Sequence, residues 1–200
     1  VLLTIDELAD AICEAVRLRG LPGMADIDSS MMLFAREIAR DHQYVLSGEC
    51  SDEVFGGYPW FNRDDLLYSE SFPWSGSIAL RESVLRGPVR AELDLAGYVA
   101  RRYHESVCSL PRLSSDSPRE AQLRQLHGLC FQWFMPNLQE RAQRMCEASG
   151  MTVLTPFCDE RLVQYVYNVP WEMKGMGGHE KGLLRAAMRD LLPDSLLYRK

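Results

Sequence analysis

Three carboxylate side chains lie close together in the segment SGECSDEVFGGYPWF, which runs from residue 47 to 61. They belong to Glu49, Asp52 and Glu53, and the segment contains no lysine or arginine. Clustered carboxylates repel one another, so they are difficult to keep ionised unless a cation lies among them. Mg²⁺ carrying nucleotide phosphates meets this need, because it takes one or two protein carboxylates and completes its shell with phosphate oxygens and water. The spacing therefore indicates a magnesium–nucleotide site.

The elements around these acids suit a ligand. Tyr44, Val45 and Leu46 predict a short β-strand, Ser47-Gly48 predicts a turn, and a helix is expected to begin near Ser51. α/β proteins bind ligands where a strand ends in such a turn, and the free N–H groups of the following helix favour an anion. A simpler interpretation stays open. Acidic residues are favoured in the first turn of any helix, so the segment could be only a well-capped helix.

Lys181 is a second candidate for chemistry, far from the first in sequence. It follows the glycine-rich residues 175–178 and is expected to open a helix. The dipole disfavours a lysine at a helix N-terminus, so a bound anion would explain its position, and the loop before it could close over a ligand. The alternative is an ordinary surface lysine.

Three strings resemble the synthetase domain of glutamine-hydrolysing asparagine synthetases. The first is SGECSDEVFGGYPWF, which follows the family pattern SGE-x-[SA]-DE-[VIL]-FGGY. The others are PFCDERLVQYVYNVPWEMK, at 156–174, and HEKGLLRAAMRDLLPDSLLYRK, at 179–200. The resemblance covers essentially the whole chain. It implies a ligase that uses ATP to convert aspartate to asparagine through β-aspartyl-AMP, with ammonia derived from glutamine.

The resemblance also implies roles on the nucleotide side of the site. Ser47 and Gly48 match the turn that contacts ATP, and Asp52 matches the carboxylate that binds Mg²⁺. Lys181 matches a lysine that contacts phosphate and steadies the charge of adenylyl transfer, which is electrostatic stabilisation of a transition state.

On the substrate side, Glu49 matches the acid required for the acyl-adenylate and for the ammonia step, in which it would act as a general base. Glu53 and Arg141 are candidates for holding aspartate. Thr152 and Leu154 stand where the family has an acid and an arginine. This departure leaves two alternatives open: a related amide- or β-lactam-forming synthetase, and a non-catalytic regulatory or interaction module on the same scaffold.

The expected fold is a mostly α-helical fragment of an α/β adenine-nucleotide-hydrolase-like (PP-loop) domain that retains one or two parallel strands. The resemblance implies that residues 1–200 correspond to the C-terminal portion of the synthetase domain, with a possible internal boundary near 110–117. The family's S-G-G-x-D-S phosphate loop and its N-terminal glutaminase domain are absent from the sequence. We therefore expect the isolated chain to be inactive.

Several local patterns predict individual elements. Thr4-x-x-Glu7 is a capping box that predicts a helix to about Arg19, and residues 26–30 are expected to cap a second helix through about Arg40. Ser117-Pro118-Arg119-Glu120 predicts another helix start, and Pro136 is expected to end or kink that helix. A short strand is expected within 151–155.

Composition limits the possible partners and location. The chain has 200 residues with a net charge of −6, which argues against a nucleic-acid partner. It has no apolar run of the ~18 residues that a membrane-spanning helix needs. Its six cysteines are scattered without a C-x-x-C pair, which argues against zinc and a disulfide framework and predicts reduced thiols in the cytoplasm. Apolar surface left by missing strands predicts a homodimer or aggregation.

Overall fold

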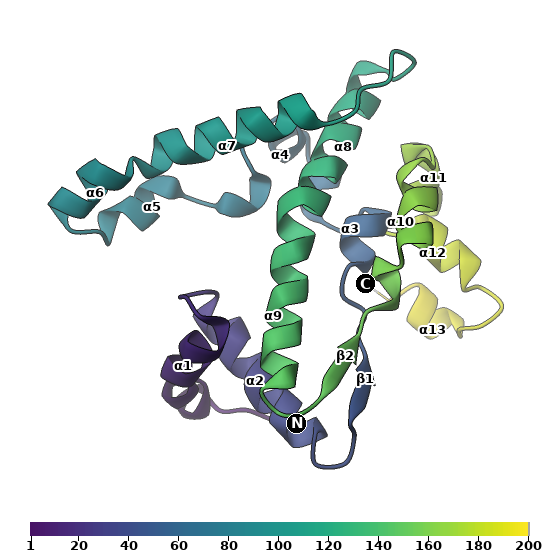
Figure 1. Cartoon of the computed structure of the whole chain (residues 1–200). Coiled ribbons are helices and arrows are strands. Elements are labelled where there is room, and N and C mark those ends of the chain that lie inside the picture. Colours follow the sequence, from purple (N-terminus) through teal and green to yellow (C-terminus); the bar gives the residue numbers. More distant parts are fainter. Residues whose placement is uncertain (200) are drawn as a thin grey trace. The chain divides into compact units, whose positions relative to one another are not determined.

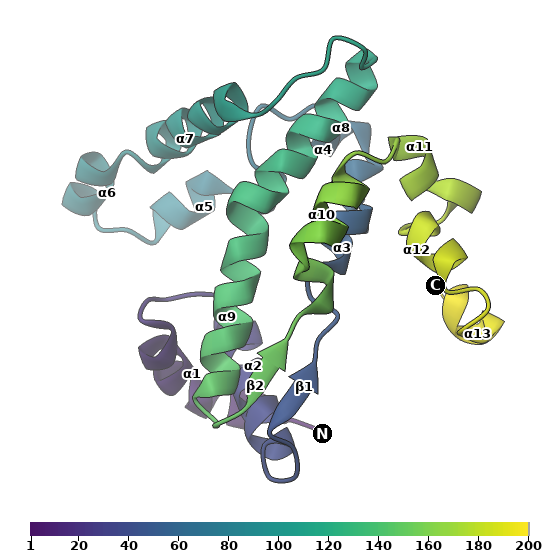
Figure 2. The ribbon, with the colours of Figure 1, turned by 45° about the vertical axis from the view of Figure 1, so that its right-hand side comes forward.

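A computed structural model of the chain describes residues 1–199, so Lys200, the last residue of the third family-like string, lies outside the described residues. The described chain is mostly helical and contains one small sheet of two parallel strands, β1 and β2 (Figures 1 and 2). The expected fold class, a helical fragment that retains one or two parallel strands, is confirmed.

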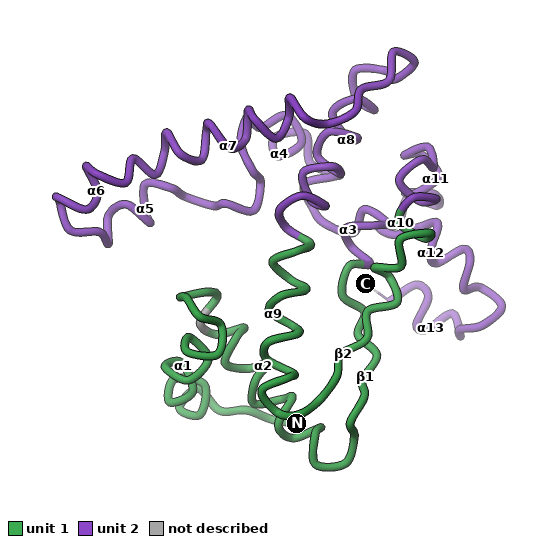
Figure 3. The backbone as a smooth tube through the Cα atoms, viewed as in Figure 1, with its two compact units in different colours: residues 1–50, 135–163 green, residues 51–134, 164–200 purple. Residues whose placement is uncertain are grey.

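The chain divides into two compact units, which we describe separately (Figure 3). Unit 1 consists of Val1–Cys50 and Met135–Val163, and unit 2 of Ser51–Phe134 and Gln164–Lys200. One division thus falls inside the segment SGECSDEVFGGYPWF (residues 47–61, called the motif below), between Cys50 and Ser51. Residues 110–117 lie within unit 2, and a domain boundary there stays a prediction.

Unit 1 contains the sheet and three long helices. Its elements are α1 (Ile5–Arg19), α2 (Ala25–Ile38), β1 (Tyr44–Leu46), α9 (Met135–Glu147), β2 (Thr152–Leu154) and the 3₁₀-helix η4 (Pro156–Cys158). The strands pair in register, with Val45 opposite Val153. α1, α2 and α9 pack against one another (Figure 1). Both strands were expected from the sequence, and both are confirmed.

The two N-terminal helices differ in how they begin. The capping box of α1 is present, since the Thr4 hydroxyl accepts from the Glu7 amide at 3.3 Å and the Thr4 amide donates to the Glu7 carboxylate at 2.7 Å. The expected cap of α2 is wrong. That helix begins at Ala25, so Asp26 and Asp28 lie inside its first turn, where carboxylates complement the helix dipole.

The core of unit 1 lies between the helices and one face of the sheet. Met32 and Met145 are fully buried between α2 and α9. Val45 and Val153 pack from the sheet against Cys146 and Met151. The alternate residues of the strands face outward, because successive side chains of a strand point to opposite faces. Three of these outward side chains are large, apolar and exposed: Tyr44, Leu46 and Leu154.

Unit 2 is built from short helices around α7 and α8. Its elements are α3 (Ser51–Phe55), η1 (Pro59–Phe61), α4 (Asp64–Leu67), η2 (Pro73–Ser75), α5 (Ile78–Ser83), α6 (Gly87–Leu93), α7 (Leu95–Ser109), α8 (Pro118–Leu129), the π-helix η3 (Cys130–Phe134), α11 (Trp171–Lys174), η5 (Met176–Gly178), α12 (Gly182–Ala187) and α13 (Asp194–Leu197). The passage from unit 1 to unit 2 at 163–164 falls within α10 (Glu160–Tyr167).

Local sequence explains both ends of α8. The expected capping box is present, with Ser117 and Glu120 bonded reciprocally and Pro118 at the first helical position. The helix then changes to π-helix over Cys130–Phe134 before α9 begins at Met135. Pro136 has no amide hydrogen to donate to the preceding turn, so the regular α-helical pattern is interrupted there, as expected.

Aromatic side chains form the core of unit 2. Phe61 is buried with Leu123 and Leu126 of α8, and Trp171 packs on it with ring centroids 4.8 Å apart. Gly56 ends α3 with a φ of 77°, and a Cβ built there would lie 2.9 Å from Cζ2 of Trp171. The second half of the motif therefore needs glycine for both backbone conformation and space.

We expect Gly56→Ala to destabilise unit 2 by roughly 2–4 kcal/mol, through left-handed strain together with overpacking. Tryptophan fluorescence during urea unfolding is a suitable measurement, because all four tryptophans (Trp60, Trp74, Trp133 and Trp171) lie in unit 2. Gly87→Ala is the matched control, since a Cβ built on this glycine would meet no atom within 4 Å. Equal unfolding midpoints for the two variants would contradict the prediction.

Among residues 1–199, the helices are too short or too polar for any of them to cross a membrane.

Candidate active site

The turn after β1 lies in unit 1 and continues the sheet. The Ser47 amide donates to the Leu154 carbonyl at 2.9 Å, and the Glu49 amide donates to the Ser47 hydroxyl at 3.2 Å. A Cβ built on Gly48 would meet no atom within 4 Å. Ser47 and Gly48, the predicted ATP-contacting residues, therefore form an ordered turn with open space beside the glycine.

Glu49 and Arg141 form an ion pair within unit 1. Their side chains are 17% and 9% exposed, and Oε1 of Glu49 lies 3.7 Å from Nη2 of Arg141. Nη1 of Arg141 contacts Sδ of Met24 at 3.8 Å, and its buried Nε has no partner among the described residues. A buried guanidinium that keeps an unused donor is suited to a carboxylate ligand. The structure thus brings a predicted catalytic acid beside a predicted substrate-binding residue.

Asp52 and Lys181 form a second ion pair, within unit 2. Nζ of Lys181 lies 2.9 Å from Oδ1 of Asp52 and donates to the Ser51 hydroxyl at 3.5 Å. Both side chains are partly exposed, Lys181 by 26% and Asp52 by 35%. Residues that are far apart in sequence, the predicted Mg²⁺ carboxylate and the predicted phosphate-contacting lysine, therefore meet at one place.

Backbone geometry holds this second pair. Lys181 is the N-cap of α12, with a φ of 55°, and α12 packs against α3. A Cβ on Gly182 would clash with the Met176 carbonyl, so glycine lets the loop and α12 approach closely. A Cβ on Gly57 would likewise collide with the Asp52 carboxylate. Glycines therefore make room on both sides of the pair.

Glu53 is placed differently from the other acids of the motif. It is 1% exposed, and the Tyr58 hydroxyl donates to its Oε1 at 2.7 Å inside unit 2. This bond ties α3 to the aromatic segment after it. A role for Glu53 in holding aspartate stays a prediction.

The carboxylates of the candidate site could supply only part of the coordination shell of a Mg²⁺ ion. Among residues 1–199, no group of three or more His, Cys, Asp or Glu side chains is arranged to hold a metal ion. Mg²⁺ bound with nucleotide phosphates needs only one or two protein carboxylates, and the partly exposed Asp52 offers one. The donor set fits a magnesium–nucleotide and does not form a closed metal centre.

Sequence reasoning missed a buried lysine in unit 2. Lys174 is 2% exposed, and its Nζ lies 3.3 Å from Nδ1 of His127, within hydrogen-bond distance, and 4.6 Å from the ring centroid of Trp171. Burial, and secondarily the charge of Arg124, lowers the pKa of Lys174 to about 7. Burial also holds the pKa of His127 well below its usual value, and the charge of Lys174 adds to this effect. No local sequence pattern predicts the contact between Lys174 and His127, because His127 lies in α8 and Lys174 in α11.

The buried amine predicts that unit 2 becomes more stable as pH rises above 7. Between the folded pKa of about 7 and the ordinary value of 10.5, the unfolded chain binds a proton that the folded chain does not. The free energy of unfolding should therefore rise with pH, by at most about 1.4 kcal/mol per pH unit. Urea unfolding between pH 7 and 9, followed by tryptophan fluorescence, measures this slope. Lys174→Met should flatten it, and equal slopes in both proteins would contradict the assignment.

The expectation that all six cysteines are reduced thiols is wrong for two of them. Cys50 and Cys158 are joined as a disulfide within unit 1, with Cα atoms 6.1 Å apart. Their separation of 108 residues gave no recognisable spacing, because the parallel strands bring together the turns that follow them. The other four cysteines are unpaired: Cys13, Cys108, Cys130 and Cys146.

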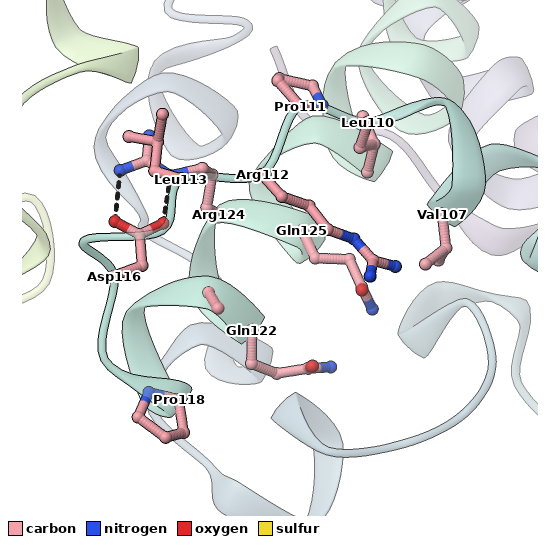
Figure 4. A pocket seen from close by; sticks show the side chains of 11 residues that line it. Val107, Leu110, Pro111, Arg112, Leu113, Asp116, Pro118, Gln122, Arg124 and Gln125 are labelled. Atoms are coloured by element: carbon pink, nitrogen blue, oxygen red, sulfur yellow. Dashed lines mark hydrogen bonds and ion pairs between the residues drawn. The ribbon is translucent and has the colours of Figure 1, made fainter.

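The pocket drawn in Figure 4 lies elsewhere, between the end of α7 and the first turns of α8 in unit 2. It has a volume of about 290 Å³ and is lined by residues between Val107 and Gln125. In the wall of this pocket, Arg124 donates two hydrogen bonds to the Asp116 carboxylate, from Nε at 2.6 Å and from Nη2 at 3.0 Å. None of the predicted site residues lines this pocket.

A parallel strand whose turn leads into an acidic helix is typical of α/β proteins, a class in which ligands bind at the ends of the strands. Comparison with known proteins makes the assignment specific. The asparagine synthase family model matches residues 1–200, and the chain belongs to this family.

Two relatives from Bacillus subtilis (strain 168) are similar to this chain in sequence. Asparagine synthetase [glutamine-hydrolyzing] 3 is 45% identical over 97% of this chain and 31% of its own length. Asparagine synthetase [glutamine-hydrolyzing] 1 is 26% identical over 88% of this chain and 33% of its own length. The chain therefore spans about a third of the length of these curated relatives.

Proposed function

We propose that this chain is the C-terminal portion of the synthetase domain of an ATP-dependent ligase that converts aspartate to asparagine, using ammonia from glutamine. The family assignment supports the reaction class. The observation that carries the site is the meeting of Asp52 with Lys181, because it joins two family-like strings at a single cation–carboxylate pair. The isolated chain needs the rest of the protein to act.

The first step activates aspartate. Ser47 and Gly48 contact ATP, Asp52 contributes a carboxylate to Mg²⁺, and the Mg²⁺ offsets phosphate charge when bound. A β-carboxylate oxygen of aspartate attacks the α-phosphorus, and pyrophosphate leaves with the electron pair of the broken bond. The Lys181 ammonium stabilises the charge that develops on the phosphate oxygens. The product is β-aspartyl-AMP.

The second step forms the amide. Ammonia attacks the β-carbonyl carbon, and AMP leaves with the electrons of the carbon–oxygen bond. Glu49 accepts the proton released from the attacking nitrogen, as a general base. Arg141 holds a carboxylate of aspartate through its unused Nε and its ion-paired end, and Glu53 is the remaining candidate for the substrate amine.

The protein is proposed to act in the cytoplasm as a homodimer, without nucleic acid or membrane as a partner. The negative net charge supports the absence of nucleic acid. The exposed apolar face of the sheet in unit 1, formed by Tyr44, Leu46 and Leu154, supports association.

The function is tested with the full-length protein, ATP, Mg²⁺ and ammonium as nitrogen donor. We expect equal amounts of AMP, pyrophosphate and asparagine, all dependent on aspartate. AMP released with another carboxylic acid, but not with aspartate, would instead identify a related amide- or β-lactam-forming synthetase. Absence of ATP–Mg²⁺ binding by calorimetry would identify a non-catalytic module.

A further inference from the structure

The disulfide-bonded residues Cys50 and Cys158 occupy two corresponding turns of unit 1. Cys50 ends the turn after β1, and Cys158 ends η4, which follows β2. Their Cα separation of 6.1 Å is within the range that a disulfide spans without backbone movement. The bond therefore joins the ends of both strands at the same edge of the sheet.

The surroundings of Cys50 form a built site for its sulfur. Cys50 is 1% exposed, and its Sγ accepts from Nε2 of Gln139 at 2.9 Å. Oε1 of Gln139 in turn accepts from the Thr155 hydroxyl at 2.9 Å, so α9 and the segment after β2 are connected through the same amide. Cys50 also has a φ of 74°, a left-handed conformation that a non-glycine residue rarely adopts. The fold therefore holds this cysteine where it meets Cys158.

The position of the pair connects it to the candidate active site. Cys50 directly follows Glu49, in the turn whose amide is bonded to the Ser47 hydroxyl. Formation of the disulfide fixes the end of this turn to η4, and reduction releases it. Cytosolic disulfides of mesophiles are usually transient and either catalytic or redox-sensing, so in the proposed compartment this pair is a candidate for redox sensing.

We propose that Cys50 and Cys158 are a reversible redox-modification site that controls asparagine synthesis. The inference rests on the proposed function for its effect on activity. The reduced enzyme is the active form, because the reduced form predominates in a compartment that keeps thiols reduced. Oxidation locks the turn that carries Glu49 and lowers synthesis.

The oxidant is a low-molecular-weight disulfide, and thiol–disulfide exchange supplies the chemistry. Cys158 is half-buried, whereas Cys50 is almost fully covered, so the Cys158 thiolate attacks first. It forms a mixed disulfide and expels one small thiolate. The Cys50 thiolate then attacks the Cys158 sulfur and expels the second. The protein loses two electrons and two protons, and the small disulfide gains both as two thiols.

The test equilibrates the full-length protein with defined ratios of oxidised to reduced glutathione. Ammonium serves as nitrogen donor, so that the N-terminal glutaminase domain implied by the family resemblance is bypassed. Mass spectrometry should detect the Cys50–Cys158 cross-linked peptide, and asparagine synthesis should fall several-fold as the peptide appears. Dithiothreitol should restore both. Cys158→Ser should keep basal synthesis and lose the response, whereas the exposed-thiol control Cys13→Ser should still respond.

Three outcomes would overturn the proposal. The cross-linked peptide could be absent at every ratio, synthesis could be unchanged when the peptide is complete, or Cys158→Ser could respond like the unmodified protein. Cys158→Ala replaces the serine variant if that protein does not fold. Failure of the proposed function is recognised separately, because a fully reduced protein would then make no asparagine while the peptide still reports whether the pair oxidises.

Discussion

Glu49→Ala is expected to abolish AMP release by the full-length protein with ATP, Mg²⁺, aspartate and ammonium. Glu49 lies at the end of the strand–turn segment, 17% exposed and beside Arg141, where it can act on a bound aspartate. Removing the carboxylate takes away the general base, and it also leaves the buried Arg141 guanidinium without its counter-charge. One effect weakens the hold on aspartate and the other removes the base of the amide-forming step, so the loss should exceed that of any other single change in unit 1.

The controls separate chemistry from folding. Glu49→Gln keeps the volume of the side chain and should still lack AMP release, whereas Glu147→Ala removes an exposed carboxylate of α9 and should retain it. Far-ultraviolet circular dichroism and thermal melting verify that each variant is folded. Unchanged AMP production by Glu49→Gln would exclude Glu49 from the reaction.

Lys181→Met is expected to lower the rate of AMP formation by roughly a hundred- to a thousand-fold, the usual loss when one preorganised charge donor of a transition state is removed. Lys181 is placed 2.9 Å from Asp52 by the close packing of the Met176–Gly182 segment, so its ammonium is preorganised. The effect should fall mainly on kcat, because the interaction strengthens as charge develops on the phosphate oxygens. Single-turnover kinetics with saturating ATP measure it.

Arg189→Met is the matched control, since Arg189 is an exposed cation shortly after α12 and should be dispensable. Lys181→Arg tests geometry, because a guanidinium keeps the charge but cannot occupy the same point beside Asp52. A loss confined to the KM for ATP, with kcat unchanged, would assign Lys181 to ground-state binding and would contradict its proposed catalytic role.

Local sequence patterns predict several helix starts and both strands of this protein correctly. The capping boxes at Thr4 and Ser117, and the two short strands, depend on interactions between near neighbours or on apolar runs, so they can be read directly from the chain. The acids of the motif and the resemblance of three strings to one family led to the same family that the comparison shows. The expected cap of the second helix was wrong because the helix begins at Ala25, which places Asp26 inside its first turn.

The amino-acid sequence alone therefore determined the family, the helical character with two parallel strands, and the identities of the candidate acids and lysine. Only the tertiary structure decided which of them meet. The Asp52–Lys181 pair, the Cys50–Cys158 bond and the buried Lys174–His127 contact each join segments separated by tens of residues or more. Such contacts depend on how elements pack, and packing distributes its information over many side chains that no single spacing records.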